Sequence, residues 1–295
     1  SQRMPERRGF GLSVHGIGSQ VGSSLGPVAT GALITLMAGG MAIAAWRSVT
    51  LLYVLPAIVM AVVVWWSLRD LGTSGTMAND PAPLRERVQG VWNLLRNRTI
   101  LALMLAILLR SMGFNSLTIW VPKYLQDSVE QGGLGMSPFL AGLNFSLLTT
   151  LGIISSPVLG MLSDRHGRKM VLIPCLTVAA LLALAIGQAG EGILLTLTIL
   201  ASGMFTYSLA QIMQATVLDQ VGRGTEGATM GTVMGLTHII SALSPMIAAG
   251  IVDAYGLGSV FYYNAALWGA TVVVLVFTSL KPPPRLAGRA PAAAG

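Results

Sequence analysis

Eight long apolar segments, separated mostly by short polar connections, are the feature that most limits how this chain can fold. Each is about as long as the roughly 20 apolar residues that an α-helix needs to cross a bilayer. Only 10% of the 295 residues are charged, against about 25% in soluble domains. The sequence therefore predicts an all-α polytopic membrane protein with about eight transmembrane helices. The spans are expected at Phe10–Met37, Val49–Leu68, Thr99–Val121, Ser137–Leu162, Met170–Ala189, Ile193–Leu218, Ala228–Val252 and Ser259–Leu280.

The basic residues of the connections predict the orientation of the chain in the membrane. All but three of the 18 Lys and Arg side chains fall on one predicted side. The exceptions are Arg47 and Lys123 on the other side and Arg110 within a span. Because cytoplasmic loops carry the excess of Lys and Arg, both termini are expected in the cytoplasm. This topology also accounts for the net charge of +7, so no nucleic-acid partner is expected.

The longest connection, residues 70–98, begins with the composition of a flexible linker, rich in Gly, Thr, Ser, Asn and Pro. Apolar residues at helical spacing follow, with basic residues between them. They are Leu84, Val88, Val91, Trp92 and Leu95. This pattern predicts an amphipathic helix on the cytoplasmic membrane surface. The alternative is a helix that binds a partner protein.

A short charged turn joins two of the apolar segments at Gly160-Met161-Leu162-Ser163-Asp164-Arg165-His166-Gly167-Arg168-Lys169. The pattern Gly-x-x-x-Asp-Arg-x-Gly-Arg-Lys between two spans resembles the signature loop of the major facilitator superfamily of secondary transporters. In that family the loop is cytoplasmic, lies between helices 2 and 3 and again between helices 8 and 9, and gates the conformational change. The resemblance assigns this gating role to Gly160, Asp164, Arg165, Gly167, Arg168 and Lys169. The alternative is an ordinary positively charged cytoplasmic loop.

The resemblance also implies a domain organisation, because the family has two six-helix bundles joined by a long cytoplasmic linker. Residues 1–69 then correspond to helices 5 and 6, and residues 70–98 to the linker. Residues 99–281 correspond to the C-terminal six-helix bundle and residues 282–295 to a disordered tail. The chain is accordingly expected to be the C-terminal part of a longer transporter.

A weak internal repeat agrees with this frame. A shift of 218 residues places Gly9, Ser23, Leu25 and Pro27 on Gly227, Ser241, Leu243 and Pro245. Parallel repeats of two six-helix halves are typical of the superfamily.

The first span carries a motif that resembles the antiporter motif on helix 5 of exporters in the family. It comprises Gly22, Gly26, Pro27 and Gly31. Glycines four residues apart let two helices approach closely, and proline bends a helix. The resemblance implies efflux, and the alternative is plain helix packing.

Polar side chains at helical spacing indicate a cavity for a solute. Tyr207, Gln211 and Gln214 lie on one face of their predicted helix. His15 and His238 titrate near neutral pH and are candidates for proton coupling. The alternative for these residues is interhelical hydrogen bonding or packing, worth about 0.6 kcal/mol per hydrogen bond. The candidate substrate-binding residues are Arg110, Asn115, Tyr207, Gln211, Gln214, His238 and its counterpart in the repeat, Gln20.

Arg110 is the most informative of these candidates, because it lies near the middle of a predicted span. A charge at the bilayer centre costs at least ~2.5 kcal/mol on insertion scales, and arginine does not lose its proton to avoid that cost. Arg110 is therefore expected to face a water-filled cavity and to bind an anionic or strongly hydrogen-bonding group of the solute. The alternative is an ion pair with an acidic residue outside this chain.

Together these features predict a secondary active transporter that moves a small solute by alternating access, with proton-coupled efflux of a drug-like or metabolite compound as the leading function. Uptake or exchange of an organic anion is the alternative within transport, and a membrane scaffold or receptor is the alternative of another class. No enzymatic activity, cofactor or metal is expected. The protein is expected to be a monomer in the plasma (inner) membrane. Its partners are the solute, a coupling proton or other ion, and the lipid bilayer.

Overall fold

The computed structural model describes residues 8–37, 42–69, 96–221 and 226–280, with side chains described from Val21 onward except at residues 42–45, 68, 226 and 228. Its α-helices are α1 (Arg8–Met37), α2 (Ala42–Leu68), α4 (Arg98–Gln126), α5 (Pro138–His166), α6 (Arg168–Gln188), α7 (Ile193–Gln220), α8 (Glu226–Ser241), α9 (Ser244–Tyr255) and α10 (Ser259–Phe277), with a 3-10 turn at Val129–Gln131. The predicted amphipathic helix at residues 84–95 and the tail at 282–295 lie outside the described residues.

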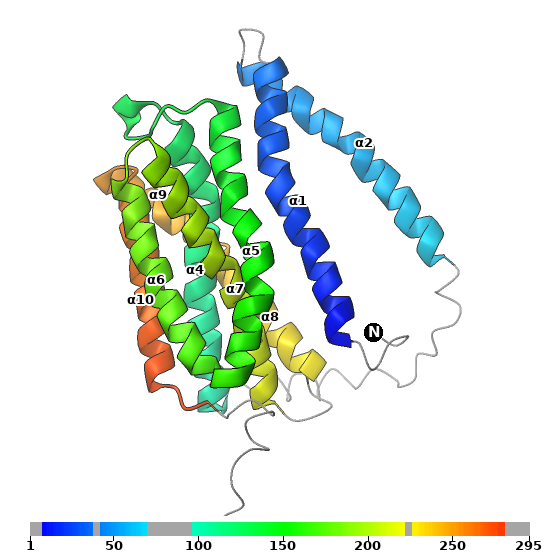
Figure 1. The fold of residues 1–295 in the computed structure, drawn as a ribbon, viewed down its shortest axis with the longest axis vertical. Helices are drawn as coiled ribbons and strands as arrows, with labels where there is room; N and C mark the ends of the chain where they lie inside the picture. Colours follow the sequence, from blue (N-terminus) through cyan, green and yellow to red (C-terminus); the bar gives the residue numbers. More distant parts are fainter. Residues whose placement is uncertain (1–7, 38–41, 70–95, 222–225, 281–295) are drawn as a thin grey trace, which may run out of the picture.

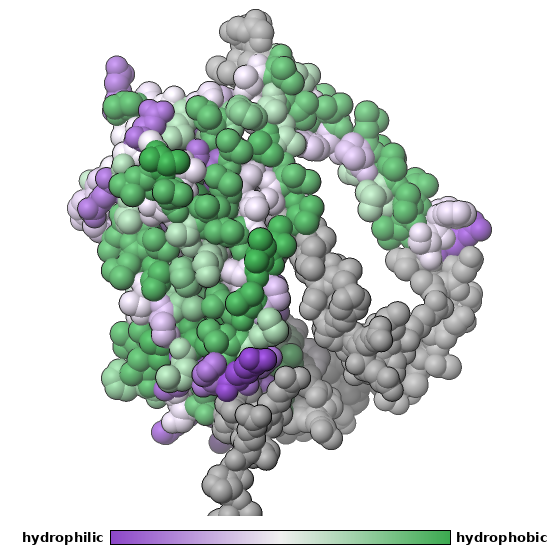
Figure 2. Space-filling model, viewed as in Figure 1, coloured by the Kyte–Doolittle hydropathy of each residue, from purple (hydrophilic) through white to green (hydrophobic). Residues whose placement is uncertain are grey.

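The prediction of an all-α membrane protein is confirmed. Seven helical segments within the described residues are long and apolar enough to cross a membrane, and Val21–Met37, the part of α1 whose side chains are described, is shorter. Figure 2 shows hydrophobic side chains over most of the flank of the bundle and over α2, with hydrophilic ones gathered toward the ends. This distribution suits a protein surrounded by lipid along its flank.

Local sequence signals set several of the helix ends. The Asn97 side chain accepts hydrogen bonds from the backbone N–H groups of Thr99 and Ile100 and so caps the start of α4. Ser137 caps α5 in the same way through the N–H of Leu140. Gly167 ends α5 and begins α6 with φ of 100°, a conformation that glycine adopts without steric cost. The two helices joined by the signature loop are thereby nearly continuous in sequence.

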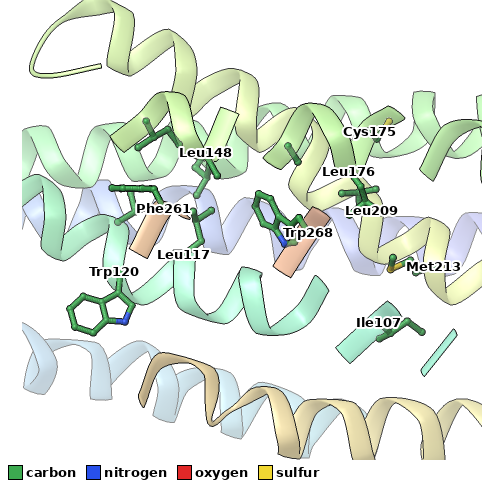
Figure 3. Close-up of a cluster of buried hydrophobic side chains, with 14 of the residues drawn as sticks. Ile107, Leu117, Trp120, Leu148, Cys175, Leu176, Leu209, Met213, Phe261 and Trp268 are labelled. Carbon is green, nitrogen blue, oxygen red and sulfur yellow. The ribbon is translucent and has the colours of Figure 1, made fainter. Parts of the chain in front are cut away.

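Helices α4 to α10 form one bundle (Figure 1), in which α10 packs against α4 and α6, and α7 against α5 and α6. Figure 3 shows the buried side chains of this bundle. They include Ile107 and Leu117 of α4, Leu148 of α5, Cys175 and Leu176 of α6, Leu209 and Met213 of α7, and Phe261 and Trp268 of α10. Trp268 also donates a hydrogen bond from Nε1 to the carbonyl of Arg110, at 3.2 Å. The Trp268 side chain of the core is thus bonded to the backbone of α4 at Arg110.

Helix α1 packs along α5, whereas α2 contacts α1 and diverges from the bundle (Figure 1). Two glycines allow the α1–α5 contact, because a Cβ on Gly31 or on Gly142 would collide with a backbone carbonyl of the other helix. Hydroxyl groups reinforce it. The hydroxyl oxygens of Ser24 and Thr150 lie 2.6 Å apart and share a hydrogen bond, and the Val28 N–H donates to Ser146 Oγ at 3.1 Å.

The expected span at Ala228–Val252 is present as one apolar segment, but the structure divides it into α8 and α9, a break that was not predicted. The break falls at Ala242 and Leu243, and Pro245 stands in the first turn of α9. Proline has no N–H to donate to the carbonyl of the residue four positions earlier, here Ser241. The two helices together still form one apolar segment, Thr229–Tyr255, that is long enough to cross a membrane.

Candidate functional site

A cavity of about 760 Å³ lies among α1, α4, α5, α7 and α8. Its volume falls within the range of small-molecule sites. It lies deep in the bundle: Arg110 is 12 residues, or about 18 Å of helix, from the start of α4. The lining residues are Gly22, Ser23, Gly26, Pro27, Arg110, Ser111, Phe114, Asn115, Thr118, Phe145, Thr149, Tyr207, Ala210, Gln211 and His238. The structure thus brings together five of the seven residues predicted to bind substrate.

Arg110 lies on the wall of this cavity, and only 7% of its surface is exposed. Its NH2 group donates to the carbonyl of Thr206 at 2.6 Å. Its Cζ lies 4.9 Å from the centre of the Phe114 ring, within the range of a cation–π contact. Its Nε is buried and makes no hydrogen bond with the described residues. Among the described residues, the groups that contact the Arg110 guanidinium are therefore neutral.

Phe114 and Tyr207 join α4 to α7 beside this charge. Their ring centres lie 5.3 Å apart, with the planes at 88°, the edge-to-face arrangement that aromatic pairs favour. Tyr207 in turn packs on Gly152 of α5, where a Cβ would meet its side chain. The aromatic wall of the cavity is thus built from three helices.

Asn115 and His238 bring α8 into the site. Asn115 Nδ2 donates to Ser241 Oγ at 3.0 Å, in the last turn of α8. The His238 ring lies one turn earlier, where Nδ1 is 2.8 Å from the carbonyl of Met234. Both side chains line the cavity, so a solute that contacts Asn115 also lies next to the end of α8.

One predicted substrate-binding residue does not line the cavity, and the side chain of another is outside the described residues. Gln211 lines the cavity one turn after Tyr207, whereas Gln214 is exposed and does not line it. The predicted polar face of α7 is therefore longer than this cavity, and a role of Gln214 in substrate binding stays a prediction. Gln20 lies on α1, but its side chain is outside the described residues, as is that of His15.

The glycines of the motif on α1 were expected to allow close helix packing, and for two of them the structure shows otherwise. A Cβ on Gly22 or Gly26 would meet no atom within 4 Å, so these two glycines do not allow a close helix contact. They line the cavity instead, together with Pro27. Gly31 alone of the three motif glycines makes the close approach, against Pro138 of α5.

The signature loop forms a network at the end of the bundle. Arg168, which is 8% exposed, binds Asp164 at 2.5 Å and Asp219 of α7 at 2.8 Å. Its NH1 also donates to Ser163 Oγ at 2.7 Å. Lys169 Nζ donates to the carbonyl of Val276, one residue before the end of α10, at 2.8 Å. The loop therefore connects the ends of α5, α6, α7 and α10, while Arg165 is exposed and Gly160 has open space beside it.

Several residues of these sites were not among the predicted ones. Asp219 was visible in the sequence only as an acidic residue near a span end. Phe114 lies four residues after Arg110, a spacing that places two side chains on one helix face, and it could have been found in that way. Nothing in the sequence singles out Phe145, Thr149 or Thr118 of the lining. No group of three or more potential metal ligands occurs within the described residues.

Comparison with known proteins identifies related sequences. A family model described as the Major Facilitator Superfamily matches residues 2–132 and 128–294. The "Multidrug resistance protein MdtG" of Serratia proteamaculans is 27% identical over 183 residues, which are 62% of this chain and 43% of that protein. The protein of the same name from Yersinia enterocolitica is 24% identical over 191 residues, which are 61% of this chain. That from Escherichia coli is 25% identical over 181 residues, which are 58% of this chain. The chain spans less than half the length of these relatives, 43% and 41% for the latter two.

Proposed function

The chain belongs to the major facilitator superfamily, and from this membership we propose that it forms part of a secondary transporter that exports a small organic solute by alternating access. The cavity is the observation that carries the proposal. It lies at mid-depth among helices that cross the membrane, where transporters of this kind bind their solutes. It also lies between α1 and the C-terminal bundle, the two parts that would move relative to each other.

Two further observations support export. The motif of Gly22, Gly26, Pro27 and Gly31 resembles that of exporters, and three of its four residues line the cavity. The relatives at 24–27% identity carry the name multidrug resistance protein. Exchange for protons remains the leading coupling mode. His238 is the candidate proton carrier in the described lining.

The proposal is tested by filling the cavity without disturbing the fold. Gly26→Phe adds a large side chain at a position where the structure has open space. Gly250→Phe is the matched control, because Gly250 is exposed on α9, outside the cavity lining, and also has open space beside it. Each variant is made in the full-length transporter of which this chain is proposed to form part. The protein is reconstituted in proteoliposomes, and uptake of a panel of labelled organic cations, anions and neutral compounds is measured under an imposed pH gradient.

We expect wild type and Gly250→Phe to transport at least one compound, and Gly26→Phe to transport it at least tenfold more slowly. Binding without transport in the wild type would favour the scaffold or receptor alternative. Equal transport rates in wild type and Gly26→Phe would exclude this cavity as the solute path.

A further inference from the structure

The two buried arginines of the described bundle have very different surroundings. Arg168 is 8% exposed and has two carboxylate partners, Asp164 and Asp219. Arg110 is 7% exposed and binds one backbone carbonyl and one ring face. Removing a charge from water costs several kcal/mol unless a counter-charge or good hydrogen bonds offset it. Arg168, which holds helices together, thus has counter-charges from the chain. Arg110, which faces the cavity, has none from the described residues.

The lining of the cavity makes this difference chemically specific. None of its described side chains is acidic, and its other polar groups are neutral amides, hydroxyls and the His238 ring. A cationic solute would meet the field of Arg110 with no carboxylate to offset the repulsion. An anionic solute would supply the missing counter-charge and gain charge-assisted hydrogen bonds, which are about twice as strong as neutral ones.

The wall beside Arg110 also has an apolar part. Phe114, Tyr207 and Phe145 line it, together with Pro27 from α1. A flat hydrocarbon group can pack against these rings while an acid group on it reaches the guanidinium. The volume of about 760 Å³ accommodates a solute with one or two fused rings.

We infer that the cavity binds an organic anion, an aromatic carboxylate or sulfonate whose acid group pairs with Arg110 and whose ring lies against Phe114 and Tyr207. This inference rests on the proposed function, since it names the solute class of the same cavity. Planar guanidinium matches the two oxygens of such an acid group, and a lysine ammonium does not.

The test uses 2-naphthalenesulfonate, which stays ionised at neutral pH, and 2-naphthalenesulfonamide, a neutral compound of nearly the same shape. Equilibrium binding of the tritiated sulfonate is measured on purified protein in lipid nanodiscs, with either compound as competitor. We expect saturable binding that unlabelled sulfonate displaces at concentrations at least tenfold lower than the sulfonamide does. This comparison needs only the wild-type protein and does not depend on the folding of a variant.

Variants then locate the charge. Arg110→Gln and Arg110→Lys should each weaken sulfonate binding at least tenfold. Arg98→Gln is the control, because it removes the same charge from the exposed start of the same helix. Thermal unfolding of each variant is measured in parallel, and the comparison of affinities is restricted to variants that unfold cooperatively.

The outcomes separate this inference from the proposed function. Equal competition by the sulfonamide, sulfonate binding that survives both Arg110 substitutions, or no saturable sulfonate binding at all would each overturn the anion site. If the same protein, reconstituted in proteoliposomes, still transports a neutral or cationic compound, export stands and only the solute class is wrong. Absence of any transport counts against the proposed function instead.

Discussion

Arg168 is the residue on which the signature loop depends, because it binds two carboxylates of unequal exposure. The side chain of Asp164 is 43% exposed and lies one helical turn before Arg168, across the turn at Gly167. That of Asp219 is 11% exposed and belongs to α7. An ion pair at this spacing whose carboxylate is exposed contributes at most about 1 kcal/mol, whereas breaking a buried pair leaves a charge without its partner. The two aspartates should therefore differ in what they do.

We predict that Asp219→Asn lowers the free energy of unfolding by about 3 kcal/mol, in the range found when one partner of a buried ion pair is removed. Asp164→Asn should lower it by less than about 1 kcal/mol but slow transport, because the family assigns gating to this position. Thermal unfolding in detergent and turnover in proteoliposomes measure the two effects. Equal loss of stability in both variants would contradict this division, and unchanged turnover in Asp164→Asn would leave the loop as a topology signal only.

The pairing of Arg168 with Asp219 shows where residue-level prediction from the sequence ends. The two are 51 positions apart, and no spacing rule connects side chains on separate helices. Arg110 was different, because the cost of a mid-span charge is a property of one residue and one helix. Its position on a cavity wall could be predicted, whereas its contacts with Thr206 and Phe114 required the structure.

Among the elements, α8 and α9 form the one candidate span that the structure divides between two helices within the described residues. Hydrogen bonds from α4 and to α4 hold the break on both sides. Asn115 donates to Ser241, Ser244 Oγ donates to the carbonyl of Met112 at 2.7 Å, and Trp120 Nε1 donates to the carbonyl of Pro245 at 3.3 Å. The break is thereby tied to the helix that carries Arg110, next to the cavity-lining Asn115.

We predict that Pro245→Ala slows transport several-fold with little loss of stability. Alanine restores the N–H that can bond to the Ser241 carbonyl, so α8 and α9 can join into one straight helix. Straightening would compete with the bonds to α4 and shift His238 on the cavity wall. Turnover in proteoliposomes and thermal unfolding measure the two effects.

Pro174→Ala in α6 is the control for Pro245→Ala, because Pro174 also lies within a helix but is exposed and outside the cavity lining. Its turnover should equal that of the wild type. Equal effects of the two substitutions would show that helix continuity at α8–α9 has no special role in transport.

The helices themselves were predicted well because membrane spans are set by length and hydropathy alone. The predicted starts of α7 and α10 and the ends of α1 and α2 agree with the structure, and other ends differ by up to seven residues. The break after Ser241 was not predicted, although Pro245 was noted. Its counterpart in the repeat, Pro27, lies inside an unbroken α1. Proline alone therefore does not break the helix, and the tertiary bonds to α4 supply the difference.

At the scale of the whole molecule, the close contacts between α1 and α5 gather toward one end of α5. The close approaches at Gly31 and Gly142 and the hydrogen bonds of Ser24 and Val28 all involve the C-terminal half of α1 and the N-terminal half of α5. The signature loop lies at the other end of α5. If that end is cytoplasmic, as the basic residues predict, the helix contact lies on the outer side of the cavity.

Orientation therefore decides which compartment the cavity faces, and the connections provide a direct test. The turn at Val129–Gln131 joins α4 to α5 and lies at the opposite end of α5 from the signature loop. The connection between α2 and α4 contains Arg69, Arg85, Arg87 and Arg96, whereas the turn at Val129–Gln131 contains an exposed Glu130 and no basic residue. Positive charge near a span favours retention in the cytoplasm, so these two connections should lie on opposite sides of the membrane.

We predict that a cysteine at Glu130 reacts with a membrane-impermeant maleimide added to intact cells, and that a cysteine at Asp80 reacts only after the membrane is opened. Both are placed in a Cys175→Ala background, which removes the single cysteine of this chain, a buried thiol. The background protein alone should stay unlabelled and serves as the control. Labelling of Asp80→Cys in intact cells, with Glu130→Cys protected, would invert the topology and place the α1–α5 contact on the cytoplasmic side of the cavity.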